Sequence, residues 1–292
     1  MTNYLKLFAS IIIVAAGLSL GFIYYQSNKL TAPALLYQTP VSSPNPKIKT
    51  VLPKEAATPP GPFIPDPKLG IYTPILMYHH IALKRPQASY YVSPGVFDSQ
   101  MKWLSDNGYK VISMDDLISG LKGTTTLPTK PTIITFDDGT VDQYANVLPI
   151  LKKYGYTATF YIISGEVGSD GYMDWSQIKE LVNNGMTIGA HSVTHPNLTH
   201  LTSTQLESEL ANSKKVIEKN LGITVKHFCY PGGAHNQVVV EKTAQYYISA
   251  TTTIHKAYHN IKSPNDFYRL ERIHIDDEMP SFIDWIRGIN LF

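Results

Sequence analysis

The sequence predicts an α/β fold of the barrel type, built from repeated strand–helix units. From Thr73 onward, short apolar runs alternate with stretches whose apolar residues recur at helical spacing. The apolar runs do not alternate with polar residues, which is typical of a parallel sheet covered by helices. About seven or eight such units are present, and this number indicates a barrel or barrel-like arrangement.

Eight short apolar runs are the expected strands. In chain order they are 74–79, 110–113, 131–136, 157–163, 186–190, 227–230, 247–252 and 268–275.

The expected helices lie between these runs and have recognisable end signals. One begins after Ser93 as N-cap, with Pro94 at its first position, and ends at Gly108. The stretch 202–222 repeats this pattern, and Asp174 is the expected cap of a further helix that begins at Trp175.

The N-terminal part, residues 1–30, is predicted to be a membrane anchor. Residues 7–25 are nineteen uncharged residues, long enough as a helix to cross a hydrocarbon core of about 30 Å. Lys6 and the α-amino group precede this stretch and Lys29 follows it, and the small excess of positive charge before it favours a cytoplasmic N-terminus with the rest of the chain exported. The alternative is a cleaved secretory signal, for which "TAPA" at 31–34 is a weak cleavage site. Either way, the folded part is expected outside the membrane, at the cell surface or secreted.

Residues 31–72 are predicted to form an extended linker between the anchor and a domain at 73–292. Ten of the twenty prolines lie in 31–67, and no apolar period accompanies them. Such a segment cannot form a core and behaves as a semi-stiff spacer.

Charge and cysteine content exclude several classes of function. The net charge is +2, but residues 1–72 hold six lysines against two acidic residues, so the remainder is slightly acidic. A domain without a basic face is a poor match for a phosphate backbone, and we expect no nucleic-acid partner. The single cysteine, Cys229, rules out an intramolecular disulfide and a multi-cysteine zinc site.

Several expected strands end in residues capable of catalysis or metal binding. Taken alone, most of these patterns are more often structural, and for the two histidines four apart chance and metal binding are about equally frequent. Only the joint placement of the patterns at strand ends favours a site. The four are Asp137 and Asp138 after 131–136, His191 and His195 after 186–190, His79 and His80 at the end of 74–79, and the turn 231–233 after 227–230.

His191 and His195 suggest a divalent metal ion. On a helical turn, residues four apart share one face, and imidazole is a preferred zinc ligand. One carboxylate of the pair Asp137–Asp138 would complete the ligand set, and its neighbour would stay free for proton transfer. The charge of the ion would also offset the repulsion between the two adjacent carboxylates.

These motifs carry a resemblance to a known family. "TFDDG", "HSVTH" and "YPGG", in this order, resemble the signature motifs of the polysaccharide deacetylase family of carbohydrate esterases. The opening "PILMYHHI" and the stretch from Tyr90 to Leu117 resemble, more narrowly, the branch that acts on poly-N-acetylglucosamine or related wall polymers. The resemblance covers roughly residues 73–290 and implies a distorted (β/α)7 barrel.

The resemblance also implies roles for individual residues. Asp137 matches the general base of the family. Asp138, His191 and His195 match the ligands of one divalent metal ion, usually zinc. Gly232 matches a backbone N–H that helps to hold the oxyanion.

The general acid is less uniquely implied. In the narrower branch it comes from the first strand, which favours His79 over His80. His274 is a rival if the chain follows the commoner motif order. Many relatives carry, at the position of Cys229, an arginine that orients the base, and we expect Arg272 to take over that function here.

The implied activity is metal-dependent removal of N-acetyl groups from an N-acetylglucosamine-containing polysaccharide. Tyr90, Tyr91, Trp175 and Tyr230 are candidates to stack on sugar rings. Three other hypotheses remain: an inactive carbohydrate-binding barrel, a non-haem iron oxygenase that also uses two histidines and one carboxylate, and a surface scaffold without a metal.

Overall fold

The computed structural model describes residues 70–83 and 90–288. The predicted anchor at 1–30 and most of the predicted linker lie outside these residues. In the part that is described, no helix combines the length and the apolar character that crossing a membrane requires. The last two residues of the predicted linker form strand β1 (Ile71–Tyr72), which pairs antiparallel with β11 (Tyr258–His259).

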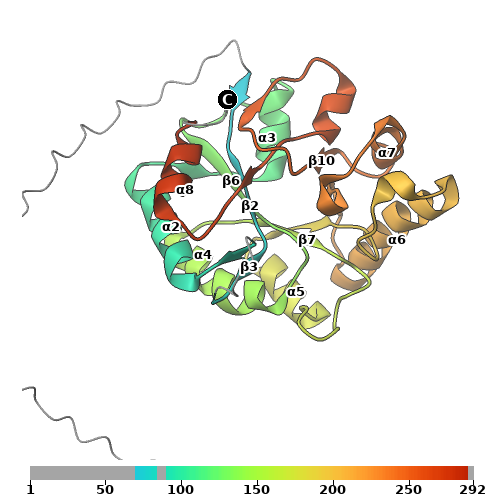
Figure 1. Cartoon of the computed structure of the whole chain (residues 1–292), viewed down its shortest axis with the longest axis horizontal. Helices are drawn as coiled ribbons and strands as arrows, with labels where there is room; N and C mark the ends of the chain where they lie inside the picture. The colour runs from blue at the N-terminus through green and yellow to red at the C-terminus, as the bar shows by residue number, and fades with distance from the viewer. Residues whose placement is uncertain (1–69, 84–89, 289–292) are drawn as a thin grey trace, which may run out of the picture. The chain divides into compact units, whose positions relative to one another are not determined.

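A parallel sheet of eight strands forms the centre of the fold (Figure 1). Its strand order is β10-β9-β8-β7-β6-β2-β12, and β5 pairs separately with β6. The strands are β2 (Ile75–Tyr78), β5 (Lys110–Val111), β6 (Pro131–Phe136), β7 (Thr159–Ile162), β8 (Thr187–Ala190), β9 (His227–Cys229), β10 (Ser249–Thr251) and β12 (Ile273–His274).

Each of the eight expected strands contains one strand of this sheet. The largest discrepancy is in the last, because the sequence predicts an extended segment throughout 268–275 and only Ile273–His274 form β12. Residue 268 instead ends a 3-10 helix, Pro264–Tyr268, which begins with a proline and a capping box at Ser263.

The two ends of the strand path are connected through the segment before β12. Thr251 of β10 and Leu270 form an isolated parallel bridge, and Leu270 forms backbone hydrogen bonds with Ala250 and Thr252. The sheet is therefore strongly curved, and with its helices it is consistent with a (β/α) barrel.

The helices surround this sheet on its outer side (Figure 1). They are α2 (Pro94–Asp106), α3 (Met114–Leu121), α4 (Leu148–Tyr154), α5 (Trp175–Asn183), α6 (Ser203–Leu221), α7 (Gln237–Thr243) and α8 (Met279–Ile286). A π-helical turn, Gln143–Val147, leads into α4.

The predicted helix ends are confirmed for α5 and α6. Asp174 and Thr202 form capping boxes at their N-termini, and Gly222 ends α6 in a left-handed conformation. Ser93 precedes α2 as expected, but its side chain does not cap the helix. Its hydroxyl and its N–H donate to Asp277 instead, which ties the start of α2 to the segment after β12.

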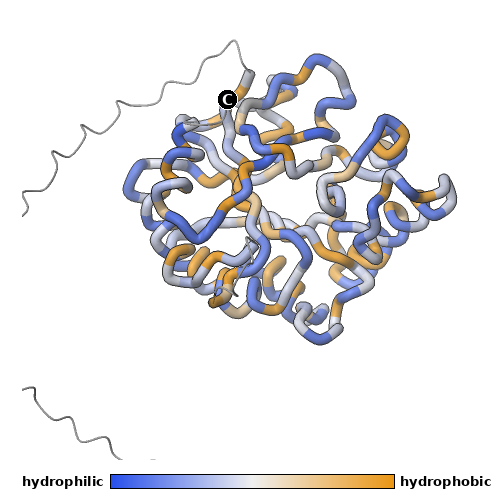
Figure 2. Tube along the Cα trace, in the orientation of Figure 1, coloured by the Kyte–Doolittle hydropathy of each residue, from blue (hydrophilic) through white to orange (hydrophobic). Residues whose placement is uncertain are grey.

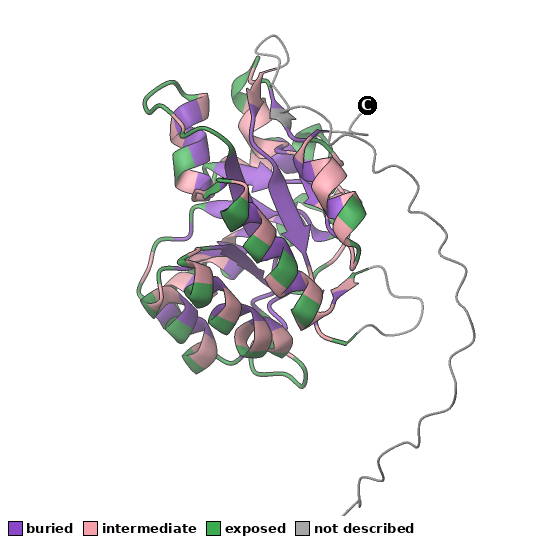
Figure 3. Ribbon diagram, turned by 90° about the vertical axis from the view of Figure 1, so that its left-hand side faces the viewer, coloured by how far each residue is buried: buried purple, intermediate pink, exposed green. Residues whose placement is uncertain are grey.

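Burial explains why the strands are apolar on both faces. All six residues of β6 are buried, and Ile134 and Phe136 join the main core while Ile133 packs in a second cluster beside α3. The strands form the buried interior in Figure 3, and the outer helices alternate between hydrophobic and hydrophilic residues in Figure 2. A continuous apolar run is thus a strand between two packed layers.

Candidate active site

A cavity of about 690 Å³ lies at the carboxyl ends of the strands. Its lining includes all the predicted site residues except Arg272, which lies behind it. They are His79, Asp137, Asp138, His191, His195 and Gly232, together with the rivals His80 and His274.

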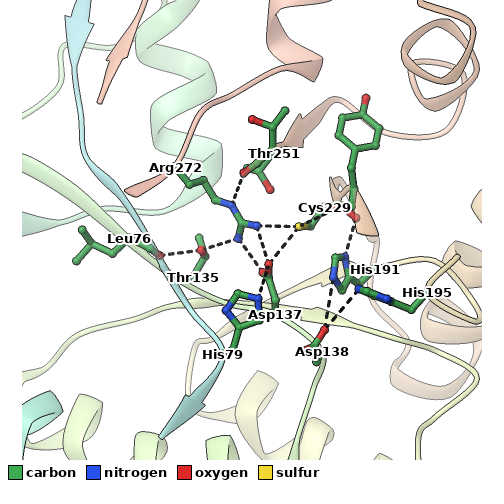
Figure 4. Close-up of polar contacts among 12 residues, drawn as sticks. Leu76, His79, Thr135, Asp137, Asp138, His191, His195, Cys229, Thr251 and Arg272 are labelled. Atoms are coloured by element: carbon green, nitrogen blue, oxygen red, sulfur yellow. Dashed lines mark hydrogen bonds and ion pairs between the residues drawn. The ribbon is translucent and has the colours of Figure 1, made fainter. Parts of the chain in front are cut away.

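The adjacent carboxylates Asp137 and Asp138 point to different partners (Figure 4). Asp138 adopts a left-handed conformation, with φ 77°, and Gly139 follows with φ 81°. This sharp turn at the end of β6 directs Asp137 toward Arg272 and Asp138 toward two histidines. The two charges are therefore compensated separately.

Asp138, His191 and His195 converge as a potential metal site. Asp138 Oδ1 lies 3.6 Å from His191 Nε2 and 3.8 Å from His195 Nε2. One ligand atom from each residue lies within 4.8 Å of the others. These separations exceed hydrogen-bond distance and match atoms grouped around a shared ion.

The expectation that His191 and His195 share a helical turn is wrong. Residues 191–195 follow β8 as a loop, in which Ser192 (φ 64°) and His195 (φ 57°) both have left-handed backbones. The two rings still meet, with centroids 4.8 Å apart. A folded-back loop therefore brings together the two imidazoles that helical spacing was expected to bring together.

His191 is held in the tautomer that a metal ligand needs. Its Nδ1 lies 2.7 Å from the backbone oxygen of Cys229, so Nδ1 carries the proton and Nε2 faces Asp138. Burial alone would lower the pKa of His191, but Cys229 and both aspartates raise it to about 10. These surroundings favour positive charge, and the donor set fits a divalent cation such as zinc.

A second potential ligand group, formed by Asp137, His191 and Cys229, fits a cation less well. Both carboxylate oxygens of Asp137 already accept hydrogen bonds from Arg272. A cation there would lie against a buried guanidinium, so Asp138, His191 and His195 are the better candidate metal site.

Arg272 forms a bidentate salt bridge with Asp137. Nη1 donates to Oδ1 at 2.7 Å and Nη2 to Oδ2 at 2.6 Å, and the arginine is 0% exposed against 2% for the aspartate. The remaining guanidinium donors reach Thr252 O, Thr135 Oγ1 and the sulfur of Cys229. Burial would raise the pKa of Asp137, but Arg272 holds it well below its ordinary value, so the carboxylate stays ionised.

His79 lies on the opposite side of Asp137 from the arginine. Its Nε2 is 3.8 Å from Asp137 Oδ2, and its ring packs against Tyr90 at a centroid distance of 4.6 Å. Burial lowers the pKa of His79 to about 4, although both aspartates act in the opposite direction. The imidazole is therefore neutral near pH 7 and must receive a proton before it can act as an acid.

The chain is similar to known polysaccharide deacetylases. The family model for polysaccharide deacetylase matches residues 124–250. YxkH of Bacillus subtilis, which is named for the same family, is 36% identical over 182 residues, or 61% of this chain and 64% of its own. The structure of the Streptococcus pyogenes deacetylase PplD in complex with acetate is 31% identical, covers 73% of this chain and 97% of its own, and has a TM-score of 0.68.

The chain belongs to the polysaccharide deacetylase family. It is also 29% identical over 207 residues to the poly-β-1,6-N-acetyl-D-glucosamine N-deacetylase of Staphylococcus aureus, covering 65% of this chain and 69% of that protein. These relatives are named for deacetylation. The chain spans only 64% of the length of YxkH, so its own activity and substrate are matters for proposal.

The two other candidates for the general acid, His80 and His274, differ in their surroundings. His80 Nδ1 lies 3.1 Å from Asp142 Oδ1, and its ring stacks on Tyr91 at 4.3 Å. The ring of His80 is thus engaged by Asp142 and Tyr91. The ring of His274 lies 6.3 Å from that of His79, and Tyr90 contacts both rings. His274 is therefore the stronger alternative to His79 as general acid.

Gly232 lies at the predicted turn after β9. Its φ of 58° is left-handed, and a Cβ there would meet open space. Glycine is therefore used for its backbone conformation, not for close packing. Of the proposed sugar-stacking residues, Tyr230 is fully buried and cannot contact substrate, whereas Tyr90 is 52% exposed and lines the cavity.

Gln143 is a site residue that the sequence did not predict. It is fully buried on the π-helical turn, and its Nε2 donates to the backbone oxygens of both His79 and Asp137. It therefore joins the ends of β2 and β6. Sequence offered no signal for it, because a glutamine near a helix start is usually exposed; π-helical turns are rare and often lie at functional sites.

Proposed function

We propose that this protein is a metal-dependent N-deacetylase that removes N-acetyl groups from an N-acetylglucosamine-containing polysaccharide of the cell surface or wall. The observation that carries the proposal is the separation of two adjacent carboxylates. Asp138 faces two histidines, and Asp137 lies beside them in the same cavity, bound by a buried arginine. The name of the Staphylococcus aureus relative supports the choice of polymer.

Asp138, His191 and His195 would hold one divalent cation, for which zinc is our choice because of the two imidazole ligands. When bound, the cation would supply Lewis acidity, which polarises a carbonyl and makes water easier to deprotonate.

Asp137 is the proposed general base. Arg272 occupies one side of its carboxylate, fixes its orientation and keeps it ionised. From this position Asp137 takes a proton from the water that attacks the acetyl carbonyl. A low pKa makes a carboxylate a weaker base, so its contribution depends on orientation more than on proton affinity.

His79 is the proposed general acid. Since it is neutral in the free protein, its proton must come from the reaction itself. Asp137 Oδ2 lies 3.8 Å from His79 Nε2 and is the proposed source of this proton. His79 then delivers this proton to the departing amine, which would otherwise be a poor leaving group.

Gly232 and Tyr90 would orient the substrate. The backbone N–H of Gly232 is proposed to stabilise the negative charge that develops on the acetyl oxygen. Tyr90 presents a half-exposed ring on the acid side of the cavity, where a pyranose face can pack. An N-terminal anchor and linker would place this cavity outside the cell membrane, close to its polymer.

Acetate release tests the proposal. The purified full-length protein is incubated with β-1,6- and β-1,4-linked N-acetylglucosamine oligomers and with wall-derived glycan, before and after chelation and after zinc is restored. We expect zinc-restorable acetate release that Asp137→Asn abolishes. Oligomer binding without acetate release under any metal condition would instead indicate a carbohydrate-binding barrel.

A further inference from the structure

The loop of residues 191–195, called here the ligand loop, carries two of the three proposed metal ligands and is held from two sides. On one side, the N–H of Ser164 donates to Ser192 O at 3.1 Å, and the N–H of Gly165 donates to Val193 O at 2.9 Å. A Cβ at position 165 would lie 2.6 Å from Val193 O, so glycine is required for this approach. The segment after β7 thus satisfies the carbonyl groups of the loop.

On the other side, a single carboxylate satisfies the amide groups. Glu209 of α6 accepts hydrogen bonds at Oε2 from the N–H groups of Val193 (2.7 Å) and Thr194 (3.0 Å). Its Oε1 accepts a hydrogen bond from Thr194 Oγ1 at 2.8 Å. The next N–H, that of His195, donates to Ser192 Oγ within the loop at 2.9 Å.

These contacts matter because the ligand loop is strained. Ser192 and His195 both have left-handed backbones, a conformation that is unfavourable for residues other than glycine and persists only where the surroundings impose it. His195 is also the least buried ligand, with 40% of its side chain exposed. Side-chain packing restrains it weakly, so its place depends on the backbone of the loop.

We infer that Glu209 is a positioning residue for the metal site, which holds the ligand loop through Val193 and Thr194 and so keeps His195 Nε2 within coordinating reach of Asp138 and His191. The inference rests on the proposed metal-dependent function. Groups that orient metal ligands commonly change metal affinity by about 10- to 100-fold.

Two substitutions separate the hydrogen bonds of Glu209 from its charge. Glu209→Gln removes the charge and keeps the reach: its carbonyl can accept both N–H groups, and its amide can donate to the hydroxyl of Thr194. Glu209→Asp keeps the charge but withdraws the carboxylate by one methylene. If positioning is the function, the aspartate variant should bind metal more weakly than the glutamine variant.

Metal affinity of the full-length protein is the primary measurement. Zinc dissociation constants come from competition with a chelating dye, and the absorption spectrum of the cobalt(II) form reports the coordination. We expect Glu209→Asp to raise the zinc dissociation constant by about tenfold or more and to alter the cobalt spectrum. Glu209→Gln should stay within about threefold of wild type.

Glu218→Asp is the matched control. Glu218 lies on the same helix and also accepts a hydrogen bond from a loop N–H, that of Val225 at 2.9 Å, but Val225 precedes β9 at the opposite end of the sheet. A general effect on α6 would lower the melting temperature of both aspartate variants without changing zinc affinity.

The outcomes separate the inference from the function on which it rests. If wild type and Glu209→Asp bind zinc equally, or if the glutamine variant is as weak as the aspartate variant, Glu209 does not act through its reach and the inference fails. If wild type itself binds neither zinc nor cobalt, the proposed metal-dependent function fails first. Turnover at saturating zinc adds a further check, because Glu209→Asp should then recover most of its kcat.

Discussion

Replacing Arg272 by methionine should remove the counter-charge of a buried base. The two atom pairs of the contact are 2.7 and 2.6 Å apart, and neither side chain has appreciable exposure, so solvent cannot replace the guanidinium. Breaking such a pair costs about 3–5 kcal/mol. Since one pKa unit corresponds to about 1.4 kcal/mol, protonation of Asp137 relieves this cost if its pKa in the variant lies about two to four above its ordinary value of 3.8.

The kinetic consequence is a loss of the base and a new pH dependence. In wild type, Arg272 keeps Asp137 ionised throughout the working range, so Asp137 imposes no acidic limb near neutral pH. In Arg272→Met we expect turnover at pH 7 to fall by about 10²- to 10⁴-fold and to rise with pH as the carboxyl ionises. Acetate release measured from about pH 5 to about pH 9, together with zinc content, gives both quantities.

Stability should change with pH in the same sense. Asp137 has a folded pKa below its ordinary value of 3.8, so its stabilising contribution is present above about pH 4 and is lost as the pH falls through the folded pKa. The difference in melting temperature between wild type and Arg272→Met should therefore be full at pH 7 and shrink in acid. Arg272→Lys keeps the positive charge but loses the planar, bidentate guanidinium, so its melting temperature and its turnover should lie between those of wild type and Arg272→Met. Unchanged turnover and an unchanged pH profile in the methionine variant, with zinc retained, would refute this reasoning.

Three further predictions concern the other side of the cavity. His79→Gln should lower kcat by about 10²- to 10⁴-fold with zinc retained, and His274→Gln by less than about tenfold; steady-state acetate release that showed the reverse order would assign the acid to His274. Asp138→Asn should leave the purified protein with substoichiometric zinc by elemental analysis, whereas a full complement would exclude Asp138 as a ligand. Tyr90→Ala should raise KM for oligomers more than it lowers kcat, and a KM unchanged across oligomer lengths would remove Tyr90 from substrate binding.

The positions of the strands could be predicted because a strand that is buried on both faces has a continuous run of apolar residues. Residues 131–136 are apolar apart from threonine, and all six are buried in β6. Helix ends marked by a polar cap and a capping box, as at Asp174 and Thr202, are equally easy to recognise. The limits of the strand within 268–275 are not, since Tyr268 still belongs to a 3-10 helix, Leu270 forms only an isolated bridge and β12 is limited to Ile273–His274.

The location of the site could be predicted for a related reason. Strands β2 and β6 are in register at Tyr78 and Phe136, and β12 and β2 at His274 and Met77. Residues that follow these positions therefore emerge at one edge of the sheet, on strands about 4.8 Å apart. The rule that catalytic residues lie at the carboxyl ends of parallel strands therefore predicts that His79 and Asp137 share one site, even before the strand order is known.

What the sequence did not reveal is how the site is held in place. The ligand loop depends on left-handed backbones at Ser192 and His195, and neither residue is a glycine that would have signalled them. Its amides are bound by Glu209, on a helix whose other glutamates bind lysines or another loop. Such contacts produce no periodic pattern in the sequence, because a single hydrogen-bonded side chain can hold the loop and any nearby helix can supply that side chain. The strand ends are therefore enough to predict the candidate ligands. Their geometry depends on contacts that only the packed structure shows. Substitutions such as Glu209→Asp test these contacts separately from the ligands.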